Sequence, residues 1–169
     1  MLSSAQLAAL KRATYSSVSC EQITRLPAEL TLAQWALESA WGQHQPGNNC
    51  FGIKAYNGCF GVQRLETFEI VDGVRQSVLQ NFATFRSLEA CFHKHADLLT
   101  GTEPYQSAWT RYLKTKDLDK LVRGIAQIYA TDPNYSKILF EIISMPQVQI
   151  ALADARRDKL TPGNSCQAA

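Results

Sequence analysis

The sequence predicts an α+β domain, with a mainly helical body and a small antiparallel β lobe. Apolar residues recur at helical spacing before residue 43 and again after residue 87. The stretch between them, about residues 51–85, is instead rich in Gly, β-branched and aromatic residues. The chain of 169 residues is long enough for one domain with its own core. We expect that domain at residues 1–160 and a mobile tail at 161–169.

The first part of the helical body is expected to contain two helices. Residues 4–15 form a short helical pattern. Pro27 begins a stronger helix over 28–42, in which apolar positions repeat at three- and four-residue intervals until Gly42. The polar stretch 43–50, with its Pro and Gly, is typical of a turn.

The β lobe is expected to hold two or three short antiparallel strands within residues 59–82. An Asp-Gly pair at residues 72 and 73 is typical of a tight hairpin turn. Strands on either side of such a turn pair with each other, which predicts a local antiparallel sheet.

The second part of the helical body follows the β lobe. Ser87 is a suitable N-cap for a helix over 88–100. Two more helices are expected over 117–129 and 134–144, separated by a Thr-Asp-Pro turn, and a weaker last one over 146–156. A cleft between the helical body and the β lobe would be a natural place to hold a polymer.

Charge and composition exclude some classes of partner. The 17 Lys and Arg residues oppose 15 Asp and Glu, and this net charge of +2 favours neither nucleic acid nor a membrane surface. No apolar run approaches the ~20 residues of a membrane span. The first residues lack the pattern of a secretory signal peptide. Five cysteines are nevertheless many for a reduced cytosolic protein, and they favour an oxidising destination.

Glu38 is the first candidate for chemistry. In the 28–42 helix it lies beside the apolar face, with Trp35 and Trp41 three residues away on either side. Indole rings that shut a carboxyl group off from water disfavour its charged form and raise its pKa. A glutamic acid that stays protonated near neutral pH can serve as a general acid. On this geometry alone, a solvated glutamate without a catalytic role is the competing interpretation.

A general acid often works with a second carboxylate, and the β lobe offers three. They are Glu66, Glu69 and Asp72. Glu66 and Glu69 fall on opposite faces of a regular strand, so only one of them can face a cleft. Asp72 lies in the expected turn and is interpreted as structural. The alternative for the whole set is an edge strand kept soluble by its charges.

Four motifs follow one another in an order that one enzyme family shares. Residues 38–42 are Glu-Ser-Ala-Trp-Gly, and residues 49–54 are Asn-Cys-Phe-Gly-Ile-Lys. Residues 67–69 are Thr-Phe-Glu, and residues 129–135 are Tyr-Ala-Thr-Asp-Pro-Asn-Tyr. Over about residues 27–143 the chain resembles glycoside hydrolase family 73, the glucosaminidase family. That family includes flagellar rod-assembly muralytic domains, autolysins and phage lysins, and the resemblance implies a lysozyme-like fold with a β lobe over the active-site cleft.

The resemblance also implies roles for individual residues. Glu38 would be the general acid that protonates the glycosidic oxygen. Glu69 would be the second carboxylate, which either activates a water or steadies the N-acetyl group of the sugar. Tyr129 would line the cleft near the reacting sugar as the third catalytic residue. The implied substrate-binding residues are Trp41, Asn49, Phe51 and Tyr135.

The chain departs from the family pattern at several positions. Ala40 stands in place of a glycine, and Leu88 stands where tyrosine is common. Cys50 replaces a leucine, and Cys59 follows nine residues later in the β lobe. We expect a disulfide between Cys50 and Cys59, which would tie the floor of the cleft to the β lobe.

No metal and no cofactor are expected. Cys91, His93 and His95 are residue types that bind metals, but residues two apart on a helix point to nearly opposite faces. A Cys–His peptidase pair, for example Cys91 with His44, has no supporting local motif.

The resemblance implies an endo-β-N-acetylglucosaminidase that cleaves peptidoglycan between N-acetylglucosamine and N-acetylmuramic acid. Two alternatives stay open: a lytic transglycosylase or muramidase, and a catalytically silent peptidoglycan-binding domain. Without a signal peptide, such an enzyme would reach the wall as a phage lysin or as an antibacterial effector of a type VI secretion system. An effector would have a cognate immunity protein that occludes the cleft. We expect a monomer.

Overall fold

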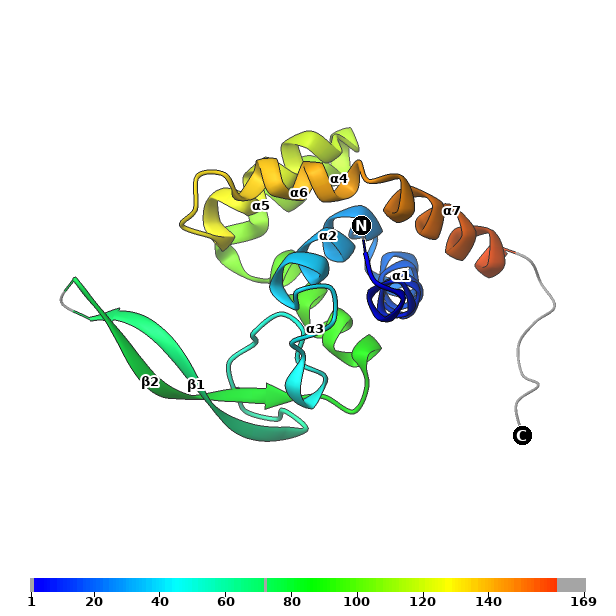
Figure 1. Ribbon diagram of the computed structural model, residues 1–169. Helices are drawn as coiled ribbons and strands as arrows, with labels where there is room; N and C mark the ends of the chain where they lie inside the picture. Colours follow the sequence, from blue (N-terminus) through cyan, green and yellow to red (C-terminus); the bar gives the residue numbers. More distant parts are fainter. Residues whose placement is uncertain (1, 72, 161–169) are drawn as a thin grey trace.

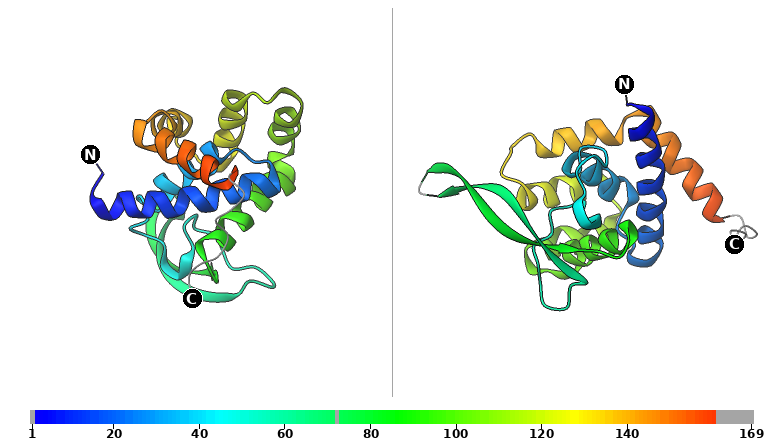
Figure 2. Two further views of the ribbon diagram at one scale, coloured as in Figure 1. Left: turned by 90° about the vertical axis from the view of Figure 1, so that its right-hand side faces the viewer. Right: turned by 60° about the horizontal axis from the view of Figure 1, so that its bottom comes forward.

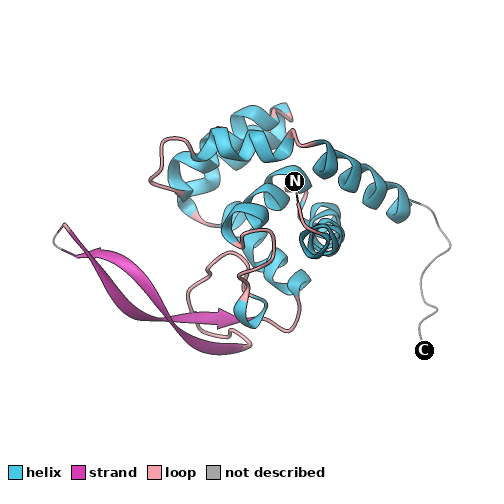
Figure 3. Ribbon diagram, in the orientation of Figure 1, coloured by secondary structure: helices cyan, strands magenta, loops and turns pink. Residues whose placement is uncertain are grey.

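The computed structural model describes residues 2–71 and 73–160, and of residues 69–71 and 160 it describes the backbone only. Within these residues, seven α-helices surround a core and one β-hairpin extends from it (Figure 1, Figure 3). The order of helices, hairpin and helices confirms the predicted α+β class, with a helical body and a small antiparallel β lobe. The expected tail at 161–169 and the turn residue Asp72 lie outside the described residues.

Helix α1 (Ser4–Thr24) is longer than the expected helix over residues 4–15. It begins at a capping box, in which the Ser3 side chain accepts from the Gln6 backbone N–H and the Gln6 side chain accepts from the Ser3 N–H. The sequence pattern misses its second half because the inward positions there are small or polar. Ser17 is fully buried, and its hydroxyl donates to the Ala28 carbonyl at 2.8 Å.

Helix α2 (Ala28–Glu38) carries much of the core. All its residues from 28 to 36 are buried except Glu29, and Trp35 has 0% of its surface exposed. The helix packs against α1 and α6 (Tyr135–Ile143). Because core packing fixes α2 on several sides, the residue at its end is held in a defined position.

The C-terminal helices form the other half of the body. Helix α3 (Leu88–Gly101) begins after the Ser87 side chain, which accepts from the Ala90 N–H as predicted for an N-cap. Two expected helices correspond to α5 (Leu118–Tyr129) and α6. Helix α4 (Gln106–Thr115) has no counterpart among the predicted elements, since its residues are mostly polar and only Trp109 in it is buried. The two short 3₁₀ helices are η1 (Pro46–Asn48) and η2 (Glu103–Tyr105).

Helix α7 (Pro146–Leu160) is tied to the start of the chain by an ion cluster. The Arg156 guanidinium lies 2.9 Å from a Glu21 carboxylate oxygen and 2.8 Å from one of Glu29. These bonds join α7 to α1 and α2. In the described part of the chain, no single helix is long and apolar enough to cross a membrane, and only α6 and α7 taken together, bent by 63°, meet that test.

The β lobe is one long hairpin rather than two or three short strands. Strand β1 (Gly61–Val71) pairs antiparallel with β2 (Val74–Thr84), from Gly61 opposite Thr84 to Val71 opposite Val74. Its far end projects away from the helical body (Figure 1, Figure 2). On β1, residues 62, 64, 66 and 68 are exposed, while 61, 63, 65 and 67 are half-buried. The hairpin therefore has one outer face and one face turned partly toward protein.

The cysteine arrangement corrects the expected Cys50–Cys59 disulfide. Both thiols are free, as are those of Cys20 and Cys91. Cys50 is buried, and its sulfur lies 3.6 Å from that of Cys91 on α3, whereas Cys59 is only half-buried near the base of the hairpin. The prediction used distance along the chain, and the fold turns Cys50 toward the helical body instead. Cys166 lies outside the described residues.

Candidate active site

Glu38 is the last residue of α2 and stands at the edge of a cavity. The helix ends here, not at Gly42, because the Ser39 hydroxyl donates back to the Trp35 carbonyl at 2.6 Å and accepts from the Gly42 N–H at 2.8 Å. Residues 40–42 then have positive φ angles of 48°, 60° and 82°. The chain reverses at this point, which leaves the Glu38 carboxylate at the end of a buried helix.

Two side chains connect the core to Glu38 by hydrogen bonds, and a third stacks on one of them. Gln34, one turn earlier on α2, donates its amide N–H to the hydroxyl oxygen of Tyr135 at 3.3 Å. Tyr135, the first residue of α6, donates its hydroxyl to Glu38 Oε1 at 2.8 Å. Tyr129, the last residue of α5, stacks on Tyr135 with 5.7 Å between ring centroids. Both tyrosines of the 129–135 motif therefore lie beside the carboxylate.

Two opposing effects act on the pKa of Glu38. Burial of the carboxylate raises the pKa, and the hydrogen bond from Tyr135, which favours the ionised form, lowers it. Burial prevails, so the pKa lies above its ordinary 4.5, although the residue keeps exposed surface toward the cavity. Burial, and next the Glu38 charge, raise the pKa of both Tyr129 and Tyr135. Both tyrosines therefore keep their hydroxyl protons at the pH values where a carboxylic acid works.

The cavity beside Glu38 has a volume of about 560 Å³. Phe51, Tyr105 and Tyr129 contribute aromatic walls, and Lys54 and Lys94 also line it. Apolar ring surfaces together with a few charged and polar groups are typical of small-molecule and sugar sites. A carboxyl group with a raised pKa in such a cavity can donate a proton to a bound molecule.

The floor of this cavity is built by the loop after η1. Phe51 packs on the His95 ring of α3, with 3.8 Å between ring centroids. Asn49 is buried and does not line the cavity. Its side chain donates to the carbonyls of Ile53 and Ala83, at 2.8 and 2.9 Å, and accepts from the Ile53 N–H at 3.0 Å. Asn49 thus fixes the floor loop to the base of the hairpin.

Of the other predicted site residues, Trp41 does not line the cavity, and the side chain of Glu69 is not described. Trp41 packs edge-on against Trp35, with 6.3 Å between ring centroids, and is absent from the cavity lining because the chain reverses after Glu38. The hydrogen-bond donor to Glu38 is Tyr135, and neither of the two indoles expected beside Glu38 lines the cavity. Glu69 pairs with Gln76 along the hairpin, but its side chain lies outside the described residues. Glu66 is exposed and accepts a hydrogen bond from Ser77.

Sequence reasoning missed two residues of this site. Gln34 precedes Glu38 by four residues, so helical spacing alone could have placed it on the same side of α2. His95 lines the cavity beneath Phe51, is 1% exposed, and neither ring nitrogen has a hydrogen-bond partner among the described residues. Burial lowers the pKa of His95 to about 3, so this imidazole is neutral. Within the described residues, no group of three His, Cys, Asp or Glu side chains could hold a metal ion.

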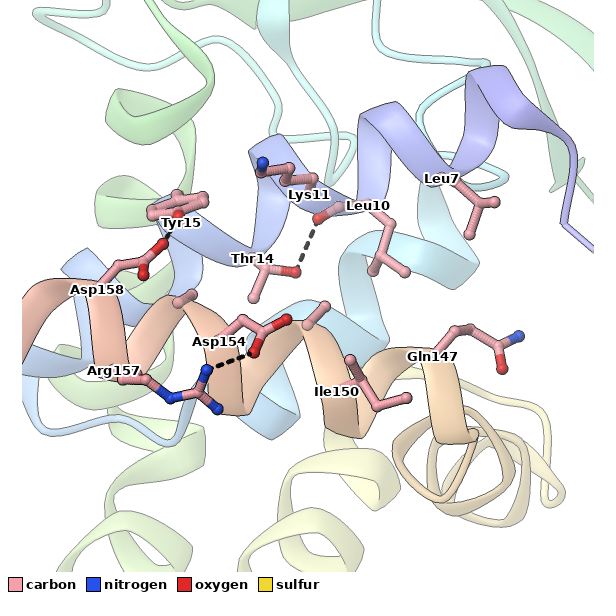
Figure 4. A pocket seen from close by; sticks show the side chains of 12 residues that line it. Leu7, Leu10, Lys11, Thr14, Tyr15, Gln147, Ile150, Asp154, Arg157 and Asp158 are labelled. Atoms are coloured by element: carbon pink, nitrogen blue, oxygen red, sulfur yellow. Dashed lines mark hydrogen bonds and ion pairs between the residues drawn. The ribbon is translucent and has the colours of Figure 1, made fainter.

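A second cavity of about 560 Å³ lies between α1 and α7, and Glu38 is not among the residues that line it (Figure 4). Its two acidic residues already have partners. Asp154 forms an ion pair with Arg157 at 3.3 Å, and Asp158 accepts a hydrogen bond from Tyr15. Since neither acid is held by the kind of buried hydrogen-bond chain found at Glu38, this groove is a weaker candidate for acid catalysis.

Comparison with known proteins agrees with this geometry. Residues 14–147, most of the chain, match the Glucosaminidase family model, described as mannosyl-glycoprotein endo-beta-N-acetylglucosaminidase. The chain belongs to the glucosaminidase family. This membership confirms the family resemblance of the four motifs and makes the protein a glycoside hydrolase by descent.

Several members of the family are similar to this chain. Peptidoglycan hydrolase FlgJ of Salmonella typhimurium is 33% identical over 126 residues, which are 70% of this chain and 39% of FlgJ. The chain thus spans well under half the length of the curated relatives that it matches. The glycoside hydrolase domain of the same FlgJ is 28% identical, with a TM-score of 0.65 over 82% of this chain and 95% of that one. The catalytic domain of the autolysin Auto from Listeria monocytogenes, at 24% identity, shares the fold, with a TM-score of 0.76 over 89% of both chains.

Proposed function

We propose that this chain hydrolyses peptidoglycan as an endo-β-N-acetylglucosaminidase, with Glu38 as its general acid. The observation that carries the proposal is the setting of Glu38 at the end of α2. Its carboxylate opens to an aromatic-walled cavity, accepts from Tyr135, and has a pKa raised by burial. Relatives that carry the name peptidoglycan hydrolase support the choice of substrate. The bond proposed for cleavage is the one between N-acetylglucosamine and N-acetylmuramic acid.

The proposed reaction begins with proton transfer. Protonated Glu38 gives its proton to the glycosidic oxygen, and the electron pair of the breaking C–O bond leaves with that oxygen. Glu69 is proposed as the second carboxylate, which either activates the attacking water or steadies the N-acetyl group if that group attacks. Strand alternation groups position 69 with residues 65 and 67 of β1, and separates it from the outer-face residue Glu66.

Tyr129 and Phe51 are proposed to bind the sugar beside Glu38. Both line the cavity, and both present aromatic surface to it. The apolar face of a sugar ring packs well on such rings. Tyr129 also keeps its hydroxyl proton, because burial raises its pKa, so it can donate a hydrogen bond to the reacting sugar.

The proposed substrate also determines where the enzyme must act. Peptidoglycan lies outside the inner membrane, so the proposal includes delivery there, as an injected antibacterial effector or as a phage lysin. An effector would be accompanied by an immunity protein that occludes the cavity around Glu38. A stable complex of this kind would bury about 1,200–2,000 Å² in total. Loss of inhibition on mutating the cavity rim would test that partner.

The central experiment replaces the acid by its amide. Glu38→Gln keeps the shape and the hydrogen bond from Tyr135, but it cannot donate the acid proton. We expect the rate on purified sacculi to fall by about 10²–10⁴, the usual value of general acid catalysis. Turbidity loss measures the rate, and mass spectrometry of the released fragments identifies the bond cleaved. A Glu38→Gln variant that keeps a third of the wild-type rate would refute the assignment, and anhydro sugars among the products would indicate a lytic transglycosylase.

A further inference from the structure

Gln34 lies where it can set the direction of the hydrogen bond to Glu38. It has 0% of its surface exposed, and its amide N–H donates to the Tyr135 hydroxyl, which in turn donates to Glu38 Oε1. The amide oxygen of Gln34 has no hydrogen-bond partner among the described residues. An unpaired buried polar atom costs free energy. A core that needed only packing at this position would be better served by an apolar side chain.

The chemistry of a tyrosine hydroxyl explains what this arrangement achieves. A hydroxyl has one proton to donate and two lone pairs that accept. Because the Gln34 N–H is directed at the Tyr135 oxygen, the Tyr135 proton is left to point at Glu38. Oε1 of Glu38 is then an acceptor in both protonation states, and the acidic proton belongs on the other oxygen, Oε2.

We propose that Gln34 is a positioning residue for catalysis, which acts through Tyr135 to keep the acidic proton of Glu38 on Oε2. This inference rests on the proposed role of Glu38 as the general acid. In the reaction the Oε2–H bond breaks, the proton goes to the glycosidic oxygen, and Glu38 is left as a carboxylate. Oε1 accepts from Tyr135 before and after the transfer, so this hydrogen bond need not rearrange.

Several other charged and titratable groups face the cavity or Glu38. Lys54 and Lys94 line the cavity, and their ammonium groups lie over the Phe82 and Tyr56 rings at 4.5 and 4.3 Å. Burial keeps His95 neutral, with its pKa lowered to about 3. The tyrosines that face the cavity or Glu38 all have a raised pKa, mainly from burial: Tyr56, Tyr105, Tyr129 and Tyr135. The alkaline limb of the pH–rate profile should therefore report Glu38.

Removing the Gln34 N–H has a predictable effect on that limb. A Tyr135 hydroxyl that accepts from Gln34 is a stronger donor to the ionised carboxylate, because hydrogen bonds in a chain polarise one another. Gln34→Met weakens that donation, which favours the protonated form and raises the pKa of Glu38. We expect the limb to move to higher pH by about 0.5–1 unit. Tyr135→Phe removes the donor altogether and should move the limb at least as far.

The decisive measurement is a double-mutant cycle on kcat and on the alkaline limb. We expect Gln34→Met to lower kcat by about 3- to 10-fold, the size of one hydrogen bond. In a Tyr135→Phe background the same substitution should add no further loss and no further shift, since Gln34 acts through that hydroxyl. The proposal would be overturned if Gln34→Met lowered kcat equally in the wild-type and Tyr135→Phe backgrounds. It would also be overturned if Gln34→Met left the alkaline limb of the wild-type profile unmoved. If Gln34→Met does not fold, Gln34→Leu takes its place, and an unmoved limb in Tyr135→Phe alone also overturns it.

A matched control separates positioning from packing. Thr31 lies one turn before Gln34 on α2, is 1% exposed, and is hydrogen-bonded to Ser17 at 2.7 Å without a link to Glu38. Thr31→Val should lower the melting temperature without moving the alkaline limb, and a limb shift here would show that any core change has this effect. Glu38→Gln distinguishes a failure of the proposed function from a failure of the positioning role of Gln34. An active Glu38→Gln variant refutes the proposed function itself, whereas an inactive one with an additive Gln34–Tyr135 cycle refutes only the positioning role.

Discussion

Glu38 and Glu66 have identical side chains in different surroundings. Glu66 is exposed on the outer face of the hairpin, where its carboxylate accepts from Ser77. Water solvates such a group. Glu38 also keeps exposed surface, but its carboxylate lies beside a cavity and accepts from Tyr135, and burial on its protein side raises its pKa. The difference is set by the helix end and the tyrosines beside it.

The two glutamates of β1 provide a test at this scale. We expect Glu69→Gln to lower the rate on sacculi by about 10-fold or more, because loss of the second carboxylate impairs attack at the sugar. Glu66→Gln is the matched control, three residues away on the same strand, and should change the rate less than 2-fold. Turbidity assays at equal concentrations of folded protein compare the two. A larger loss at Glu66 would mean that the outer face of the hairpin carries the chemistry.

Among the elements, the chain reversal after α2 has the strongest influence on the site. The repeat of apolar residues predicted that α2 would continue to Gly42, but a hydrophobic pattern does not record a helix end made by backbone conformation. Here Ser39 caps the helix, and Gly42 adopts a φ of +82°. The capping signals at Ser87 and Pro27 were recognised because a side chain or a ring marks them in the sequence. The sequence did not reveal that the two strands pair over a full 11-residue register, since the length of a strand depends on its partner strand.

Gly42→Ala tests the reversal directly. A Cβ at Gly42 would lie 3.0 Å from the Ala9 Cβ and 3.1 Å from the Trp35 ring, at a backbone angle that favours glycine. Gly58 has a similar φ of +85° with no atom within 4 Å of a Cβ, so Gly58→Ala reports the backbone cost alone. We expect the backbone cost to lower the free energy of unfolding by about 1–2 kcal/mol in both variants. Overpacking should lower it by about 1–3 kcal/mol more in Gly42→Ala. Urea unfolding measures both, and equal values would show that Ala9 and Trp35 adjust freely.

The contact between the floor loop and α3 makes a second prediction about elements. Burial raises the pKa of Cys50, and the hydrogen bond from the Cys50 thiol lowers the pKa of Cys91, which favours Cys91 over Cys50 as the sulfur that attacks an oxidant. If the chain refolds with oxidised glutathione, we expect Cys50 to be linked to Cys91, with both thiol hydrogens passed to the glutathione disulfide. The sulfurs need only approach from 3.6 Å to about 2.05 Å. Non-reducing peptide mapping identifies the pair. Cys59→Ala should keep it, and a Cys50–Cys59 link would contradict it.

At the scale of the whole molecule, the site is assembled from segments far apart in the chain. Motif matching found Glu38, Phe51 and Tyr129, and all three line one cavity. The hydrogen bond from Tyr135 to Glu38 joins residues 97 positions apart and depends on how α6 packs on α2. No local pattern encodes that packing, which is why Tyr135 was expected as a substrate-binding residue and not as a hydrogen-bond donor to Glu38. The same holds for the Cys50–Cys91 contact, which needs the floor loop to lie on α3.

The last prediction joins the proposed chemistry to the place where it must occur. Peptidoglycan lies outside the inner membrane, so we expect the chain to be harmless when it is produced in the cytoplasm of a Gram-negative host. Fusion to a secretory signal should make the same host lyse, because the enzyme then meets its substrate. Exported Glu38→Gln should not cause lysis, while exported Glu66→Gln, with its outer-face change, should lyse as fast as wild type. Optical density and phase-contrast microscopy follow the cultures. Killing from the cytoplasm would contradict peptidoglycan as the substrate, and lysis by exported Glu38→Gln would point to damage that needs no catalysis.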